Sequence, residues 1–170
     1  MKTAAKIAVL LAVIAGAVIF LAKPERTHDD ASLRQDTNEA IQTIDQRAEQ
    51  IDSFFQGKKM PLAGFGKKFV EEADRNGIDW RLMPAISVRE SGGGKQACGN
   101  NPFGWASCRI NFKSTEEAIE VVAWNLGGNN PQTSSYYEGN TEQKLWSYNG
   151  SVNPCYPGEV LSIMEQIGLK

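Results

Sequence analysis

The sequence contains few of the residues that build the most common nucleophilic and metal sites. Its 170 residues include one histidine, His28, in a polar stretch close to the N-terminus. A Ser-His-Asp site, a Cys-His site or a zinc site with histidine ligands therefore cannot form inside a domain that follows it. The three cysteines, Cys98, Cys108 and Cys155, form no CxxC pair, which argues against a thiolate zinc cluster. We expect no metal and no organic cofactor, and chemistry from carboxylates, amides, hydroxyls and aromatic rings.

An excess of positive charge is also missing. Residues 53–170 carry 12 Lys and Arg against 12 Asp and Glu, and residues 1–52 carry 6 against 8. A domain without net charge lacks the basic field that nucleic-acid binding requires, so no nucleic-acid partner is expected. The composition is otherwise that of a globular protein, with 41% hydrophobic and 22% charged residues, and the length suits one domain with appendages.

One long apolar run lies at the N-terminus. Residues 7–22 read IAVLLAVIAGAVIFLA and follow Lys2 and Lys6. We interpret residues 1–23 as an uncleaved transmembrane helix whose basic flank stays in the cytoplasm, which makes the rest of the chain membrane-anchored and extracytoplasmic. The alternative is a cleaved signal segment, which would leave a secreted protein.

Residues 24–52 form a polar linker with a helical pattern in its second half. Ile41, Ile44, Ala48 and Ile51 recur at spacings of three, four and three residues, which predicts a short amphipathic helix. Two heptads are too few to indicate a coiled coil. We therefore expect a helical spacer that packs its apolar stripe on the following domain, residues 53–170.

The domain is expected to be mainly α-helical, with one small irregular or β lobe. From apolar spacing and capping residues we predict helices over residues 65–76, 79–90, 114–126, 140–146 and 157–167. Pro84 should bend the second of these helices, and Gly92, Gly93 and Gly94 should end it. Residues 95–113 have no helical period and predict a loop or a small hairpin. A cleft between the two lobes is where we expect a ligand.

Glu90 stands out among the carboxylates by its position. It continues the apolar helix face formed by Met83 and Ile86, where a carboxyl group is partly desolvated. A partly desolvated carboxyl group holds its proton more readily, which suits a general acid that protonates a leaving oxygen. The plainer interpretation is a helix-end glutamate that is solvated or paired with Arg89 or Arg109.

A segment rich in asparagine and aromatic residues, Asn100-Asn101-Pro102-Phe103-Gly104-Trp105, follows the glycines. Aromatic faces stack on sugar rings, and asparagine side chains bond hydroxyl and acetamido groups as donor and acceptor. The segment therefore predicts a carbohydrate site, although Phe103 and Trp105 would serve equally well as packing residues of the irregular lobe.

Three motifs together resemble the lysozyme-like peptidoglycan hydrolases. They are PLAGFGKKFVEEADRNGIDWRLMPAISVRESGGGK, then NNPFGW, then Tyr148-Asn149-Gly150, within roughly residues 60–167. The bacterial endo-β-N-acetylglucosaminidase branch of the autolysins is most similar, with a glutamate at a helix end, a small-residue turn and an Asn-Leu-Phe-Gly-like motif. Soluble lytic transglycosylases share the Glu90-Ser91 pair and a late Tyr-Asn element. Pro102 departs from the usual leucine, and the Gly-Leu-Met-Gln element of the transglycosylases is absent.

The resemblance implies a lysozyme-like α+β domain that cleaves β-1,4 bonds between the amino sugars of peptidoglycan strands. It makes Glu90 the catalytic acid and places Tyr148 near the sugar at the scissile bond, although a core aromatic would fit Tyr148 as well. The residues expected to bind the glycan are Asn101, Phe103, Trp105, Tyr148 and Asn149. The alternatives are a lytic transglycosylase with the same acid, a non-catalytic peptidoglycan-binding module, and an interaction stalk formed by residues 33–55.

A glycosidase that uses two carboxylates needs an acidic partner for Glu90. No aspartate follows Asp79, and several of the remaining glutamates are explained by helix capping or by polar helix faces. Glu120 and Glu138 remain as candidates, and Glu138 lies in a polar loop suited to reaching over a cleft. If neither serves, the acetamido group of the substrate or a single-acid transglycosylase route would take its place.

Cys98 and Cys108 bracket the Asn-Pro-Phe-Gly segment, with nine residues between them. In an oxidising compartment we predict a disulfide between these two cysteines, worth roughly 2–3 kcal/mol in the chain-entropy model. Pairing of either cysteine with Cys155 stays open as an alternative.

Overall fold

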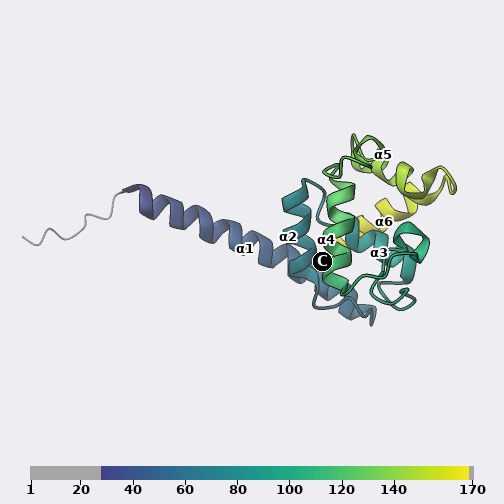
Figure 1. Ribbon diagram of the computed structural model, residues 1–170. Helices are drawn as coiled ribbons and strands as arrows, with labels where there is room; N and C mark the ends of the chain where they lie inside the picture. Colours follow the sequence, from purple (N-terminus) through teal and green to yellow (C-terminus); the bar gives the residue numbers. More distant parts are fainter. Residues whose placement is uncertain (1–27, 169–170) are drawn as a thin grey trace, which may run out of the picture.

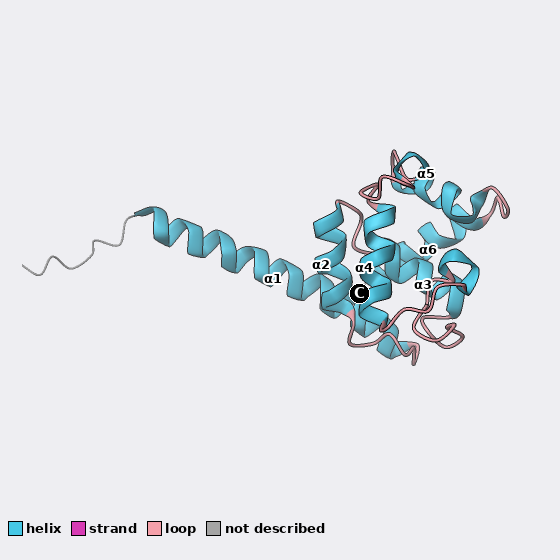
Figure 2. Cartoon of the chain, viewed as in Figure 1, coloured by secondary structure: helices cyan, strands magenta, loops and turns pink. Residues whose placement is uncertain are grey.

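The computed structural model describes residues 28–168, which form helices joined by loops (Figures 1 and 2). The elements are α1 (His28–Gly57), α2 (Gly66–Asn76), α3 (Leu82–Ser91), the 3-10 helix η1 (Trp105–Cys108), α4 (Thr115–Leu126), the 3-10 helix η2 (Ser134–Tyr136), α5 (Thr141–Leu145), the π-helix η3 (Trp146–Gly150) and α6 (Tyr156–Gly168). Within this described part there is no strand beyond an isolated bridge between Cys98 and Asn101. The prediction of a mainly α fold is confirmed, and its smaller lobe is irregular, so the β alternative for that lobe is wrong.

The predicted membrane segment, residues 1–23, lies outside the described residues. Between residues 28 and 168, no helix combines the length and the apolar character that a bilayer crossing requires.

α1 is one continuous helix that extends from the predicted linker into the domain. Its outer turns project away from the other helices (Figure 1), and Leu33 and Ile41 are 65% and 50% exposed there. Its inner turns pack against α2 and α6 and bury Ala48 and Ile51. The predicted stripe therefore does pack on the domain, but the predicted boundary at residue 53 falls inside a helix.

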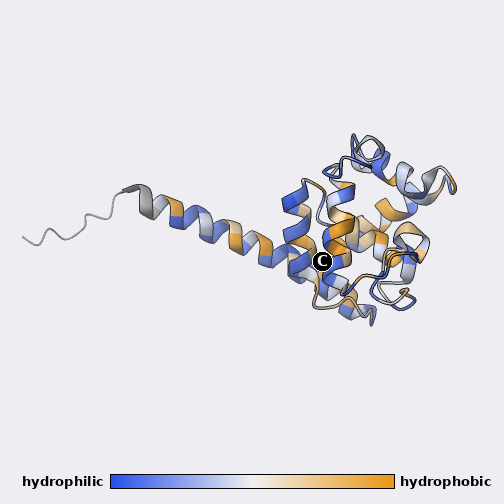
Figure 3. Cartoon of the chain, in the orientation of Figure 1, coloured by the Kyte–Doolittle hydropathy of each residue, from blue (hydrophilic) through white to orange (hydrophobic). Residues whose placement is uncertain are grey.

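α3 lies at the centre of the domain, in contact with α2, α4 and α6. Residues 82–87 of this helix are all buried, because a helix that is hydrophobic on all sides is covered on all sides. Outside α3, the largest fully buried side chains of the described residues are Ile51, Phe54, Phe55, Phe69, Phe103, Ile119, Leu126, Leu145 and Tyr156. Figure 3 shows hydrophobic residues on the inner faces of the helices and hydrophilic residues outside. Only the last turn of α3 leaves this core.

Most helix ends follow the predicted capping signals. α2 ends at Gly77, whose φ is 64°; the Ser114 hydroxyl accepts from the backbone N–H of Glu117, and Asn140 opens α5 with a capping box. Pro84 is the third residue of α3, where a backbone N–H has no partner within the helix in any case. Pro84 therefore removes no hydrogen bond from α3, and the physical reason for predicting a bend there does not apply.

Candidate active site

A pocket of about 650 Å³ opens at the end of α3. It is lined by Glu90, Gly104, Trp105, Ala106, Ser107, Thr133, Tyr137, Tyr148 and Asn149. These residues come from the last turn of α3, from η1 and the glycine before it, from the segment after α4 and from η3. Glu90 is the one carboxylate among the lining residues.

The three glycines after α3 hold Glu90 in place by reversing the chain directly behind it. Gly92, Gly93 and Gly94 all have positive φ, at 63°, 66° and 95°. The N–H of Gly92 bonds the carbonyl of Val88 at 2.9 Å, and that of Gly93 bonds the carbonyl of Ser87 at 3.0 Å. This pattern satisfies carbonyls at the helix end that would otherwise lack partners. Glu90 is therefore fixed at the end of a rigid, buried helix.

The two oxygens of the Glu90 carboxyl group have different surroundings. Oε1 is buried and has no hydrogen-bond partner of good geometry among the described residues. Oε2 lies beside Gly104, so close that a Cβ at this glycine would be 3.3 Å from it. Gly104 also has a φ of 61°, a conformation that glycine adopts at little cost. The absence of a side chain at this position leaves room for the carboxyl group.

Residues 98–108, which we call the disulfide wall, form one side of the pocket. Cys98 and Cys108 are joined by a disulfide with their Cα atoms 5.9 Å apart, which confirms the predicted pairing, and Cys155 is free and exposed. Ala106, Ser107 and Cys108 have φ values of 53°, 56° and 60°. Left-handed backbone at residues other than glycine costs about 1–3 kcal/mol per residue and persists where the surroundings impose it. Here the covalent loop closure helps to impose it.

Side-chain hydrogen bonds hold the disulfide wall against α3. The Ser91 hydroxyl donates to the carbonyl of Pro102 at 2.7 Å and accepts from the N–H of Gly94 at 3.0 Å. Asn101 bonds both backbone groups of Trp105, at 3.0 and 3.1 Å. Ser91 thus has a structural part in the Glu90-Ser91 pair: it links the helix end to the loop that passes over Glu90.

Two of the residues predicted to bind glycan lie in the interior instead. Asn101 is 1% exposed, and its side-chain amide is used by the turn just described. Phe103 is fully buried and packs edge-on against Phe69, with ring centroids 6.3 Å apart. Both residues shape the disulfide wall without reaching the pocket. The other three predicted residues, Trp105, Tyr148 and Asn149, do line the pocket.

Residues 125–137, which we call the amide wall, carry Thr133 and Tyr137 to the pocket. The buried side chain of Asn125 accepts from the Asn130 amide at 2.9 Å and from the Thr133 hydroxyl at 2.6 Å. The ammonium group of Lys144 donates to the carbonyl of Leu126 at 2.8 Å and also to the carbonyl of Tyr137. Burial lowers the pKa of this lysine. A polar network therefore holds this segment, in which the end of α4 and the short η2 are the regular structure.

Aromatic rings join the two walls. The Trp105 ring lies 5.6 Å from that of Tyr148 and 6.1 Å from that of Tyr137. The Tyr148 hydroxyl donates to the carbonyl of Phe103 at 2.6 Å. Burial raises the pKa of Tyr137 to about 12, and burial followed by the negative charge of Glu90 raises the pKa of Tyr148 well above its usual value. Both phenols stay neutral at physiological pH, so their hydroxyl groups act as hydrogen-bond donors.

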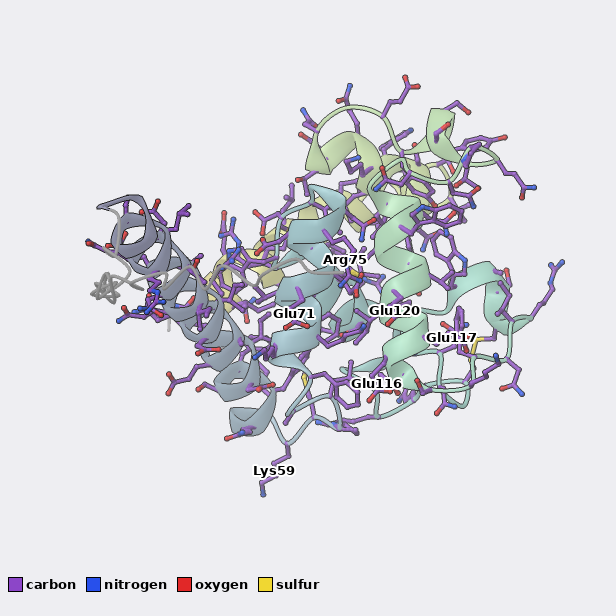
Figure 4. All side chains as sticks on the ribbon, turned by 60° about the vertical axis from the view of Figure 1, so that its left-hand side comes forward. Lys59, Glu71, Arg75, Glu116, Glu117 and Glu120 are labelled. Atoms are coloured by element: carbon purple, nitrogen blue, oxygen red, sulfur yellow. A yellow bond between two sulfur atoms is a disulfide. The ribbon has the colours of Figure 1, made fainter. Side chains whose placement is uncertain are left out.

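The two glutamates predicted as the second carboxylate do not line the pocket. Glu120 lies on α4 beside α2 (Figure 4), where it forms an ion pair with Lys68. Glu138 is exposed, whereas its neighbour Tyr137 turns inward. The structure therefore brings Glu90 together with neither candidate.

Sequence reasoning missed several residues of the site. Thr133, Tyr137, Ala106 and Ser107 line the pocket, and Tyr156 lies beneath it, with its ring stacked on that of Tyr148 at 5.9 Å. Tyr137 directly precedes the predicted Glu138, so the predicted loop does reach the pocket, but with Tyr137. Tyr156 carried no signal, because an aromatic residue at a helix start is most often a packing residue.

The described residues contain no cluster of three or more His, Cys, Asp or Glu side chains that could hold a metal ion. Comparison with protein-family models, with curated proteins and with solved structures finds no match to this chain. We therefore infer the function of the pocket from its own residues and from the motifs of the sequence.

Proposed function

We propose that this chain is a cell-wall glycosidase that cleaves β-1,4 bonds between the amino sugars of peptidoglycan, of the endo-β-N-acetylglucosaminidase type. The observation that carries the proposal is the placement of Glu90. It is the one carboxylate lining the pocket, lies at the end of a buried helix, and shares the pocket with the aromatic side chains of Trp105, Tyr137 and Tyr148. The lysozyme-like hydrolases, which the sequence motifs resemble, use a helix-end glutamate as their acid.

The rest of the pocket suits a sugar. Trp105, Tyr137 and Tyr148 supply aromatic rings that can pack against the apolar face of a sugar ring. Thr133 and Asn149 supply a hydroxyl and an amide for the hydroxyl and acetamido groups. The volume of about 650 Å³ lies in the range of small-molecule sites. No charged group other than Glu90 lines the pocket, as a neutral glycan requires.

One carboxylate is sufficient for the reaction when the substrate supplies the nucleophile in place of a second carboxylate. Glu90 donates its proton to the bridging oxygen while the bond from that oxygen to C1 breaks. The carbonyl oxygen of the neighbouring acetamido group attacks C1 and forms an oxazolinium ion. The Glu90 carboxylate then takes a proton from a water molecule, whose oxygen bonds to C1 as the oxazolinium ring opens. The product has a reducing end, and Glu90 is protonated again.

A lytic transglycosylase would use the same first half of this reaction. Glu90 would then take the proton of the C6 hydroxyl of the same sugar, whose oxygen closes a 1,6-anhydro ring on C1. The lack of a second carboxylate in the pocket supports this alternative as much as acetamido-assisted hydrolysis. The two products differ by one water molecule.

The proposed site of action is the cell envelope. A disulfide at Cys98–Cys108 is typical of proteins exposed to an oxidising compartment. The apolar run of residues 7–22 would hold the chain in the membrane, with glycan strands outside it as the partner. A cleaved N-terminal segment would instead give a secreted enzyme with the same pocket.

The first test is digestion of purified peptidoglycan by the full-length chain in detergent. We expect fragments with reducing N-acetylglucosamine ends, identified by mass spectrometry. Glu90→Gln should lower the rate by about 1,000-fold, because general acid catalysis contributes about 10²- to 10⁴-fold. A soluble version should begin at residue 28, because α1 is continuous across residue 53.

Glu138→Gln is the matched control, since it neutralises a carboxylate outside the pocket. It should leave the rate unchanged, and a large loss would restore a two-carboxylate mechanism. Anhydro fragments, one water lighter, would identify a transglycosylase. Equal binding of peptidoglycan by wild type and Glu90→Gln without any release of fragments would instead identify a non-catalytic binding module.

A further inference from the structure

Two buried polar atoms, one on a residue that lines the pocket and one on a residue beneath it, have no hydrogen-bond partner of good geometry among the described residues. They are Oε1 of Glu90 and the hydroxyl oxygen of Tyr156. A carboxylate oxygen accepts hydrogen bonds and a phenol hydroxyl donates one, so each atom has what the other lacks. Buried polar groups are paired in the great majority of folded proteins.

The two groups are neighbours in the structure. After burial, which is the largest cause, the closeness of the Glu90 carboxylate is the next cause that raises the pKa of Tyr156. The Tyr156 hydroxyl therefore keeps its proton at physiological pH. It is available as a donor throughout the range in which Glu90 would act.

The ring of Tyr156 is held firmly from several sides. It is fully buried and stacks on the ring of Tyr148 with an angle of 5° between the planes. The Arg89 guanidinium lies 5.8 Å from its centroid and is itself bonded to Glu159 at 2.6 Å. With the ring fixed, the hydroxyl group has one rotatable bond with which to find an acceptor.

We infer that Tyr156 is a positioning residue, whose hydroxyl donates a hydrogen bond to Oε1 of Glu90 and so leaves Oε2 to deliver the proton. The kinetic consequence of this inference rests on the proposed function. The hydrogen bond between Tyr156 and Glu90 does not depend on it. Oε2 lies beside Gly104, a residue that lines the pocket, so it is the oxygen that substrate can reach. Holding Oε1 prevents rotation of the carboxyl group and keeps Oε2 aimed at the substrate.

Most of the other charged and titratable groups around Glu90 already have partners, which makes Tyr156 the best candidate for the donor to Oε1. On α3 the neighbour is Arg89, which already bonds Glu159. On η3 it is Tyr148, whose hydroxyl is committed to the carbonyl of Phe103. The disulfide wall, residues 98–108, has no ionisable side chain apart from its paired cysteines. Tyr137 also lines the pocket, but the buried hydroxyl without a partner of good geometry among the described residues is that of Tyr156.

The contact can be measured without any enzymatic activity. The chain has four tyrosines, so labelling with tyrosine carrying ¹³C at Cζ gives four NMR signals that single Tyr→Phe variants assign. We expect Glu90→Gln in the full-length chain in detergent to shift the Tyr156 signal. In the reverse experiment, Tyr156→Phe should shift the ¹³C signal of the Glu90 carboxyl carbon, assigned by its loss in Glu90→Gln. Tyr136→Phe, at an exposed phenol outside the pocket, should leave the Glu90 signal in place.

Kinetics test the positioning part. Tyr156→Phe keeps the ring stack, so folding should be retained, and the melting temperature checks this. We expect kcat on peptidoglycan to fall by about 10- to 100-fold with little change in KM, because misplacing a catalytic group slows the reaction and Tyr156 does not line the pocket. Tyr136→Phe should retain wild-type kcat.

The outcomes separate this inference from the proposed function. If Tyr156→Phe moves neither the Glu90 signal nor kcat, the inference is wrong, whatever the enzyme does. If the signals shift reciprocally but kcat stays at the wild-type value, the contact exists and its positioning role is refuted. If the signals shift and the wild-type chain releases no fragments from peptidoglycan, the proposed function fails while the contact between Tyr156 and Glu90 stands.

Discussion

The two walls of the pocket are held in place by different means. The disulfide wall is closed by a covalent bond and contains three consecutive residues with left-handed backbone. The amide wall is held by hydrogen bonds of Asn125 and Lys144, and its backbone meets no covalent constraint. A covalent closure can hold strained backbone next to a reactive group. A segment held by several hydrogen bonds can instead rearrange when one of those hydrogen bonds is lost. Glu90 touches the strained wall.

Among the changes that compare the two walls, the largest effect is expected from adding a methyl group at Gly104 of the disulfide wall. At Gly104 a Cβ would lie 3.3 Å from Oε2 of Glu90, and the φ of 61° disfavours any side chain. We expect Gly104→Ala to lower kcat/KM on peptidoglycan by about 100-fold, because a small displacement of a catalytic group has an effect of this size. The free energy of unfolding should fall by about 1–2 kcal/mol from the left-handed backbone.

Gly128→Ala is the matched change in the amide wall. Gly128 has a φ of 73°, and a Cβ there would come no closer than 3.7 Å to any neighbour. The loss of stability should therefore be similar to that of Gly104→Ala, but most of the activity should remain. Equal losses of activity in the two variants would mean that the effect at Gly104 is general destabilisation and has nothing to do with Glu90.

The next effect concerns the covalent closure. The double variant Cys98→Ser, Cys108→Ser removes the disulfide without creating a new thiol. We expect a loss of about 2–3 kcal/mol in the free energy of unfolding, as the chain-entropy model gives for a short loop. Hydrogen exchange should quicken in residues 98–108 and stay slow in residues 125–137. Faster exchange in both walls would show that the two are one cooperative unit rather than two.

The helices and the catalytic candidate could be predicted because their signals are local. Gly77, Ser114 and Asn140 act at the helix end where they stand, and the glycines after Glu90 end α3 by their own backbone conformation. Glu90 could be singled out because its place at the end of an apolar helix is followed directly by a glycine turn and the Asn-Pro-Phe-Gly motif. The pairing of Cys98 with Cys108 was similarly indicated by their short separation.

The walls could not be predicted in detail because their contacts link distant parts of the chain. The same asparagine chemistry serves a sugar or a turn, and Asn101 serves a turn because Trp105 presents both backbone groups to it. Tyr137 faces inward in place of Glu138 because Lys144, seven residues later, holds its carbonyl. Tyr156 lies under Glu90 only once α6 packs against α3. None of these choices leaves a periodic pattern.

The smallest expected effect is a pH dependence of stability that arises in the amide wall and not in the disulfide wall. Residues 98–108 contain no side chain that titrates while the disulfide is intact, whereas Tyr137 of the amide wall has a pKa raised to about 12 by burial. An unfolded tyrosine has a pKa of about 10. Between these values the unfolded chain releases a proton that the folded chain retains, so stability is complete below about pH 10 and falls as the pH rises toward 12. The loss attributable to Tyr137 should reach about 2 kcal/mol.

Tyr137→Phe should therefore flatten the alkaline end of the stability profile, measured by urea unfolding between about pH 8 and pH 12. Part of the loss of stability at high pH should remain in this variant, because burial also raises the pKa of Tyr148 and Tyr156. Tyr136→Phe removes an exposed phenol close by and should leave the profile as in the wild type. Hydrogen exchange at alkaline pH should quicken first in residues 125–137, because Tyr137, the residue that ionises, belongs to that wall. If residues 98–108 open first instead, the covalent closure is the weaker of the two constraints, and the contrast between the walls is reversed.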